Sequence, residues 1–359
     1  MISGKYLRMI VMLSIMVLLS GLTACGVQKN TDKTTSVAED TAIAEEQSRV
    51  TLTVESETAV TDELQSREQI MEESVENCET KTQEETVAPQ DEVPAETAQS
   101  QPMEYTDLQQ ITLDPDWEYA DHSKINTGAA VLYRAPEESG RKGIVIGVNA
   151  GHGTSGGTKV KTLCHPDGSA KVTGGSTAAG ATEAAAVSGG MAFQDGTPER
   201  EVTLRMAQIL RDKLLTSGYD VLMLRDSEDV QLDNVARTVI CNNVADCHIA
   251  LHWDSGDGKN YDKGCFYISV PEALKSMEPV ASHWQQHDTL GTDLVEGLRE
   301  QGAMIYGKGN MSIDLTQTSY STIPSVDMEL GNAYSDHSDV VLEQLATGLL
   351  AGINTYFEQ

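Results

Sequence analysis

Four side chains of this sequence combine residue types and positions that suit hydrolytic metal chemistry. His152 lies between two glycines after the apolar run GIVIG, His252 is near the end of the run CHIALHW, and Glu329 is near the end of IPSVDMEL. Glu199 directly follows a proline at the start of an amphipathic run. Two histidines and one carboxylate can hold a zinc ion that keeps a position open for water. A second carboxylate can pass the proton of that water to a leaving nitrogen. These residues therefore predict metal-assisted hydrolysis of an amide.

The elements that would position these side chains alternate between strands and helices. Short apolar runs predict strands, and apolar residues at helical spacing predict helices. The expected strands are 143–149, 219–224, 247–253, 263–270 and 323–330, and the expected helices are 197–217, 232–243, 282–301 and 338–357. This order predicts an α/β fold, a single domain with a mostly parallel mixed sheet flanked by helices on both faces. Sites in such sheets gather at the carboxyl ends of strands, where His152, His252 and Glu329 would lie.

Local signals refine the ends of these elements. Gly151 and Gly153 allow a sharp turn that would let the His152 ring face the crevice. Thr197 is expected to cap the helix 197–217, with a proline at its first position. Glu199 would then lie in the first turn. Glu201 is a rival ligand, but it would point elsewhere around the helix.

The motifs GHG, PEREVTL, ALHWD and PSVDMELGN occur in this order. Together they resemble the zinc-dependent N-acetylmuramoyl-L-alanine amidases of the Amidase_3 type, over about residues 143–358. The resemblance implies that His152, Glu199 and His252 bind Zn²⁺ and that Glu329 is the catalytic residue. It also implies that the substrate is peptidoglycan, cut at the amide between N-acetylmuramic acid and L-alanine. Arg237 matches an arginine of the family, for which we expect a structural role.

The sequence departs from the family pattern in three places. Asn149 stands where an aspartate is usual, and Trp253 stands where a small residue is usual. A Gly-, Ala- and Thr-rich insert spans residues 158–196 and contains Cys164 and His165. Loops of this length are usually functional or disordered. The insert could cover the site as a lid or contribute to the choice of substrate.

The N-terminal part of the chain is expected to lie outside the folded domain. Residues 1–25 combine a basic start, a short apolar run and the stretch LTAC, which resembles a bacterial lipoprotein signal ending in a lipobox. Cys25 would carry the lipid and attach the protein to the membrane. Residues 26–104 read as a disordered acidic linker, because they hold few bulky apolar residues. The catalytic domain would be 105–359. We therefore expect an extracytoplasmic protein that is lipid-anchored to the outer face of the bacterial cell membrane.

Other residues with metal or thiol chemistry give weaker signals. His283 and His287 share one face of a predicted helix, but their stretch is polar and indicates a solvated surface. His248 faces the same side of its strand as His252, as a core residue or as a support for the site. A disulfide is possible in this compartment. Cys241, Cys247 and Cys265 nevertheless lack metal spacing and are expected to be small buried apolar residues.

Two other functions agree with the same residues. The domain could be a non-catalytic cell-wall-binding lipoprotein, or it could be a zinc hydrolase of another amide or peptide. Other classes are disfavoured. The net charge of -30 comes with no basic patch, so no nucleic-acid partner is expected. The sequence also contains no P-loop.

Overall fold

The structure is a computed structural model that describes residues 108–255, 258 and 260–358. The signal segment with Cys25 and the acidic linker, residues 1–104, lie outside the described residues. Within the described ranges, no helix is long and apolar enough to cross a bilayer.

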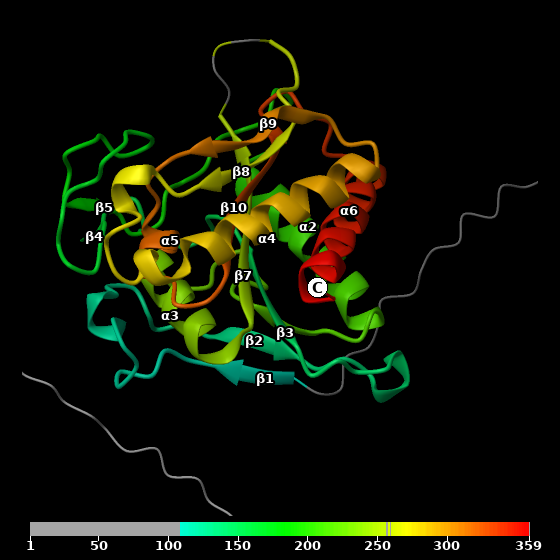
Figure 1. Cartoon of the computed structure of the whole chain (residues 1–359), viewed down its shortest axis with the longest axis horizontal. Coiled ribbons are helices and arrows are strands. Elements are labelled where there is room, and N and C mark those ends of the chain that lie inside the picture. Colours follow the sequence, from blue (N-terminus) through cyan, green and yellow to red (C-terminus); the bar gives the residue numbers. More distant parts are fainter. Residues whose placement is uncertain (1–107, 256–257, 259, 359) are drawn as a thin grey trace, which may run out of the picture. The chain divides into compact units, whose positions relative to one another are not determined.

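The described residues form one large sheet, one small hairpin and five α-helices (Figure 1). The strands of the large sheet are β1 (Leu108–Ile111), β2 (Ala130–Tyr133), β3 (Val145–Ala150), β6 (Asp220–Met223), β7 (Cys247–Asp254), β8 (Cys265–Ser269), β9 (Ile305–Ser312) and β10 (Ser325–Asn332). The hairpin consists of β4 (Lys161–Leu163) and β5 (Glu183–Ala185). The helices are α2 (Glu199–Thr216), α3 (Asn234–Val244), α4 (Val280–Glu300), α5 (Thr316–Tyr320) and α6 (Asp339–Phe357).

The strand order of the large sheet is β1-β2-β6-β3-β7-β10-β8-β9. The four central strands, β6, β3, β7 and β10, are parallel, whereas β2 and β8 run antiparallel to their inner neighbours. This arrangement confirms the predicted α/β domain with a mostly parallel mixed sheet. Strands β1, β2 and β9 were not expected from the sequence. Strands β1 and β9 are the two edges of the sheet, where partial exposure removes the continuous apolar run that marks a buried strand, whereas β2 is a mostly buried run of only four residues, AVLY.

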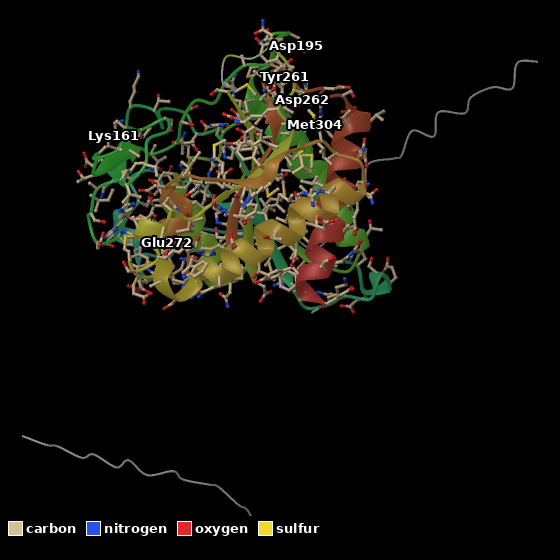
Figure 2. The ribbon with its side chains drawn as sticks, turned by 45° about the horizontal axis from the view of Figure 1, so that its top comes forward. Lys161, Asp195, Tyr261, Asp262, Glu272 and Met304 are labelled. Carbon is tan, nitrogen blue, oxygen red and sulfur yellow. The ribbon has the colours of Figure 1, made fainter. Side chains whose placement is uncertain are left out.

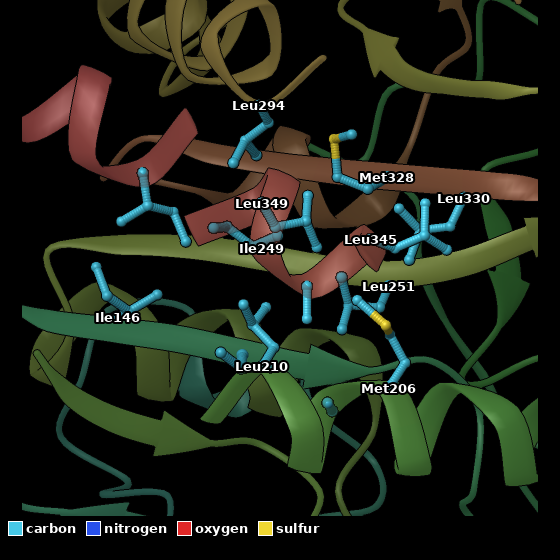
Figure 3. Packing of buried hydrophobic residues seen from close by; sticks show 14 of the residues in the cluster. Ile146, Met206, Leu210, Ile249, Leu251, Leu294, Met328, Leu330, Leu345 and Leu349 are labelled. Atoms are coloured by element: carbon cyan, nitrogen blue, oxygen red, sulfur yellow. The ribbon is translucent and has the colours of Figure 1, made fainter. Parts of the chain in front are cut away.

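The two faces of the central strands differ in composition. One face packs against α2, α4 and α6 and forms the main apolar core, which includes Ile249, Leu251, Met328 and Leu330 (Figure 3). Side chains alternate along a strand, so His252 and the other residues between these apolar positions point to the opposite face. Helices α3 and α5 lie on that side, with α3 contacting β3 and β7 and α5 contacting β10. The polar residues of β7 and β10 therefore collect on one face, near the carboxyl ends of the strands.

The start of α2 differs from the sequence-based expectation. The helix begins at Glu199, Pro198 occupies the N-cap position, and no side chain caps the helix. The prediction that Thr197 is the cap is wrong, because the Thr197 amide donates to Asp195 Oδ1 at 2.9 Å in a preceding turn. Glu199 nevertheless lies in the first turn, as expected.

Asp220 holds the loop between β2 and β3 to the base of β6. Its carboxylate accepts hydrogen bonds from Arg134, from Arg141 and from the Ala135 amide, at 2.7–2.9 Å. Burial by itself would raise the pKa of Asp220, but these donors outweigh it and lower the pKa. A lowered pKa in the folded state stabilises the fold above the pKa of the unfolded chain, and this contribution is lost as the pH falls through the folded pKa.

We expect Asp220→Asn to lower the free energy of unfolding by about 2 kcal/mol, because two half-buried guanidinium groups lose their anion. Urea denaturation at pH 7 measures this change. The matched control is Glu296→Gln, which removes an exposed ion pair with Arg299 on α4 and should cost less than about 0.5 kcal/mol. Equal effects of the two variants would contradict the assigned role of Asp220.

Candidate functional site

Two buried arginines hold the turn that follows β3. His152 has a φ of 65°, a left-handed conformation that is uncommon for a residue with a side chain. Arg237 donates to the carbonyl oxygens of His152 and Ala150 at 2.6 and 3.1 Å, and Arg225 donates to the Gly151 carbonyl at 2.9 Å. Both guanidinium groups thus donate to backbone oxygens of the turn and hold its conformation. The contacts of Arg237 match the structural role expected for it.

Asn149 takes part in the same arrangement. Its Oδ1 accepts a hydrogen bond of 3.0 Å from Arg237 Nη1. The departure from the usual aspartate therefore leaves an oxygen in contact with the arginine that fixes the turn.

The turn brings His152 to Glu199 and His252. His152 Nε2 lies 2.8 Å from Glu199 Oε1, and His252 Nδ1 lies 3.1 Å from each of these two atoms. The three donor atoms lie within 4.8 Å of one another, close enough for a single ion to contact all three. Among the described residues this is the only such group of three histidine, cysteine or acidic side chains. Two imidazoles and a carboxylate are the donor set of many catalytic zinc sites, so the residues fit this metal.

Glycines make room for the rings of this group. A Cβ atom on Gly151 would lie 2.2 Å from Cε1 of His252, so the imidazole packs directly against the backbone there. A Cβ atom on Gly190 would lie 2.9 Å from Cδ2 of His152. The sequence suggested that Gly151 serves the sharp turn. The structure instead gives the positive φ to His152 and Gly153, and Gly151 provides the close approach.

The second half of the insert supports two of the three candidate ligands. His152 Nδ1 lies 3.0 Å from the Ser188 carbonyl oxygen, to which its N–H donates, and this leaves Nε2 free for a metal. The Met191 amide donates to Glu199 Oε2 at 2.9 Å, and the Trp253 amide donates to Oε1 at 3.1 Å. Ser188 and Met191 make these contacts through backbone atoms, which every residue type has, so neither residue belongs to a recognisable motif. The sequence therefore gave no signal for either residue.

Two further carboxylates face the cleft from β10. Glu329 pairs in register with His252 of β7, and Asp327 precedes Glu329 by two residues on the same face of the strand. Burial, and then the Asp327 carboxylate, raise the pKa of Glu329 well above its usual range. Within the described part of the chain, Glu329 Oε2 and Asp327 Oδ1 are buried and have no hydrogen-bond partner. Unpartnered buried oxygens of this kind are costly, and they indicate a site that is completed by something outside the chain.

The carboxylates also determine the charge of the candidate ligands. Burial alone would lower the pKa of His252, but Asp327 and Glu199 raise it to about 10. Burial would raise the pKa of Glu199, but hydrogen bonds from His152 and His252 lower it well below its usual range. Glu199 is therefore anionic at neutral pH. It offers an anionic oxygen to a divalent cation.

These residues line a cleft with a volume of about 520 Å³. The insert and the segment 313–317 contribute to its walls, and the candidate ligands, Asp327 and Glu329 also line it.

The insert is anchored by His165, whose Nε2 lies 2.9 Å from Asp314 Oδ1, with both side chains fully buried. Lys171 contacts the same aspartate. The insert carries the hairpin, whose Ala184 and Ala185 line the cleft, while Lys161 lies at the periphery of the domain (Figure 2). The insert is therefore folded and forms a wall of the site.

The comparison with protein families agrees with this geometry. Residues 146–350 match the family model described as Amidase_3, N-acetylmuramoyl-L-alanine amidase.

The chain belongs to this family.

Its members are hydrolases that act on the cell wall, and every candidate ligand and Glu329 lie within the matched residues. No curated protein sequence matches the chain.

A solved structure of an amidase shares the fold, and a second is similar. The N-acetylmuramyl-L-alanine amidase of Mycobacterium smegmatis is 17% identical, with a TM-score of 0.50, and the match covers 60% of this chain and 97% of that chain. The corresponding enzyme of Mycobacterium abscessus is 19% identical, with a TM-score of 0.49, and the match covers 60% and 99%.

Other residues singled out from the sequence lie away from the three candidate ligands. Glu201 is exposed and pairs with Arg200 at 3.7 Å. His287 is buried and its Nδ1 accepts from the Ser325 amide at 2.9 Å, whereas His283 donates to the Pro279 carbonyl at 2.8 Å. The two histidines do not form a metal group with a third ligand among the described residues.

The structure places the remaining candidates in the core. Burial lowers the pKa of His248 to about 3, and its two nitrogens have no hydrogen-bond partner among the described residues. His248 is therefore a neutral core residue at neutral pH. The cysteines of the described domain are free and buried, as expected for Cys241, Cys247 and Cys265; Cys164 of the insert is also buried and free.

Proposed function

We propose that this chain is a zinc-dependent N-acetylmuramoyl-L-alanine amidase that cleaves the amide between N-acetylmuramic acid and L-alanine in peptidoglycan. The observation that carries the proposal is the convergence of His152 Nε2, Glu199 Oε1 and His252 Nδ1 in a cleft that Glu329 also lines. Family membership supports the choice of bond and substrate.

His152, Glu199 and His252 would hold the zinc ion through these three atoms. When bound, zinc would lower the pKa of a coordinated water to about 7 and polarise the carbonyl of the scissile amide. The Ser188 carbonyl and the amides of Met191 and Trp253 keep the ligands in place before substrate arrives.

Glu329 would carry the proton during the reaction. Its carboxylate accepts a proton from the attacking water as the oxygen bonds to the carbonyl carbon of the muramic acid lactyl group. It then donates this proton to the amide nitrogen as the C–N bond breaks, which releases the amino group of L-alanine. Burial and the nearby Asp327 carboxylate raise the pKa of Glu329, so its carboxylate is a stronger base than an exposed glutamate.

We also propose that the enzyme acts outside the cytoplasm, attached to the outer face of the membrane through a lipid on Cys25. The LTAC stretch and the apolar run before it support this proposal. Mass spectrometry of the N-terminal peptide from membranes tests it: a diacylglyceryl group on Cys25 is expected, and an unmodified peptide that retains residues 1–24 would contradict it.

The reaction is tested with the full-length protein and purified peptidoglycan. We expect release of stem peptides with a free N-terminal L-alanine, loss of that release after treatment with a chelator, and recovery when Zn²⁺ is added back. Mass spectrometry of the soluble products identifies the bond that is cut.

Two results would favour the other functions. Binding of peptidoglycan by the zinc-loaded protein without release of peptides would indicate a cell-wall-binding protein. Cleavage of free peptides at rates equal to those on muropeptides would indicate a hydrolase of another amide.

A further inference from the structure

Asp327 is a second acidic residue of β10, beside Glu329, and the proposed mechanism gives it only an effect on the pKa of Glu329. It lies on β10 in register with Ala250, two residues before the pair formed by Glu329 and His252. Since side chains on the same face of a strand repeat every two residues, Asp327 faces the cleft together with Glu329. Asp327 also lines the cleft.

The only ion-pair partner of Asp327 among the described residues is His252. Asp327 Oδ2 lies 3.8 Å from His252 Nε2, and Asp327 Oδ1 is buried without a hydrogen-bond partner in the described part of the chain. The side chain is only 13% exposed. Burial of a carboxylate without a hydrogen-bonded or charged partner destabilises the folded protein. The position of Asp327 is therefore favourable only if His252 serves as its partner.

The two nitrogens of His252 face different groups. Nδ1 lies 3.1 Å from both Glu199 Oε1 and His152 Nε2, so it is the atom that the group of candidate ligands uses. Nε2 is the nitrogen on the side of Asp327. An imidazole that offers the lone pair of Nδ1 to a metal must carry its proton on Nε2. A carboxylate that accepts this proton in a hydrogen bond fixes the tautomer and the orientation of the ring and makes the ligand more basic.

His152 shows the same arrangement with a different acceptor. Its outward nitrogen, Nδ1, lies 3.0 Å from the Ser188 carbonyl. Both imidazoles therefore have an oxygen on the side away from the other ligands: a backbone carbonyl for His152 and a carboxylate for His252. The 3.8 Å distance from Asp327 is longer than a hydrogen bond, so a hydrogen bond to His252 requires the two side chains to approach each other.

We propose that Asp327 is the positioning residue of His252, accepting the Nε2 proton so that Nδ1 is held, unprotonated, toward the metal. The inference rests on the proposed metal centre and deepens it. Asp327 acts through His252 and touches no reacting atom, in contrast to Glu329 on the same strand.

The test measures metal affinity in the full-length protein. The Zn²⁺ dissociation constant is obtained by competition with a chromophoric chelator for the wild type, Asp327→Leu and Asp327→Asn. We expect Leu, which has no acceptor, to weaken binding by about 10- to 100-fold, the range for loss of a group that supports a metal ligand. Asn keeps an acceptor oxygen and should recover most of this loss. The control is Glu201→Gln, an exposed carboxylate near Glu199 whose removal should change the constant by less than about twofold.

Two further readouts separate positioning from a structural role. The visible spectrum of the Co²⁺ form should change in Asp327→Leu and remain close to the wild type in Asp327→Asn, because the spectrum reports ligand geometry. The thermal stability of the metal-free protein should not fall in Asp327→Leu, because a buried carboxylate is removed.

The outcomes distinguish this inference from the proposed function. Wild-type zinc affinity in Asp327→Leu would overturn the positioning role and leave the metal centre intact. An equal loss of affinity in the Leu and Asn variants would also overturn it. Failure of the wild type itself to bind zinc would overturn the metal centre, and the positioning role with it.

Discussion

Glu329→Gln is expected to lower the turnover of peptidoglycan by about 100-fold or more, because the amide cannot accept the proton of the attacking water. The substitution keeps the size of the side chain, and Glu329 is not among the three candidate ligands. Zinc affinity should therefore stay within about twofold of the wild type, since Glu329 forms no hydrogen bond or ion pair with the three candidate ligands among the described residues. Release of L-alanine-terminated peptides measures turnover, and chelator competition measures zinc binding.

Two comparisons make this prediction specific. Glu201→Gln removes an exposed carboxylate on α2, the helix that carries Glu199, and should leave turnover unchanged. Added zinc should not restore Glu329→Gln, because the lost function is proton transfer. Full activity of Glu329→Gln would show that another group, with Asp327 the nearest acidic candidate on β10, carries the proton.

Glu199→Gln is expected to weaken zinc binding by more than about 100-fold, which exceeds the loss expected from a supporting residue because an anionic ligand itself is removed. The amide oxygen of glutamine can accept only one of the two hydrogen bonds that the amides of Met191 and Trp253 donate to the native carboxylate, because its nitrogen is a donor. The change therefore removes the negative charge of the ligand together with one of its supporting hydrogen bonds. Activity at stoichiometric zinc should be lost.

The contrast with Glu329→Gln is the critical measurement. Excess Zn²⁺ should restore part of the activity of Glu199→Gln, because the catalytic groups remain in place. The two variants would then have different defects. Glu329→Gln binds zinc but does not turn over substrate, whereas Glu199→Gln binds zinc weakly and recovers turnover when zinc is added. Wild-type zinc affinity in Glu199→Gln would mean that the metal is held elsewhere.

The sequence by itself determined the fold class and the residues that meet at the site. Apolar runs of strand length alternate with helical periodicity, and this local pattern predicts a parallel sheet whose strands end at one edge. His152, His252 and Glu329 follow or end three such strands, so the topology brings them together. The resemblance of four ordered motifs then assigned Glu199 to the same group.

The sequence was less informative about elements near the edges of the sheet and about the insert. Strand β9 contains two glycines, an exposed lysine and an exposed asparagine, so its pairing with β8 left no apolar run to detect. The insert 158–196 folds against the domain through His165 and Asp314, which are 149 residues apart. No local pattern encodes a contact of that separation.

Only the tertiary structure decided how the candidate ligands are supported. Ser188 contacts His152 through a backbone oxygen, which any residue could supply. Asp327 was not singled out from the sequence, because its partner His252 lies on the neighbouring strand of the sheet. Which nitrogen of each histidine faces the other ligands depends on these contacts. The residue types therefore predict that a metal can bind, whereas the packing around them decides which atoms bind it.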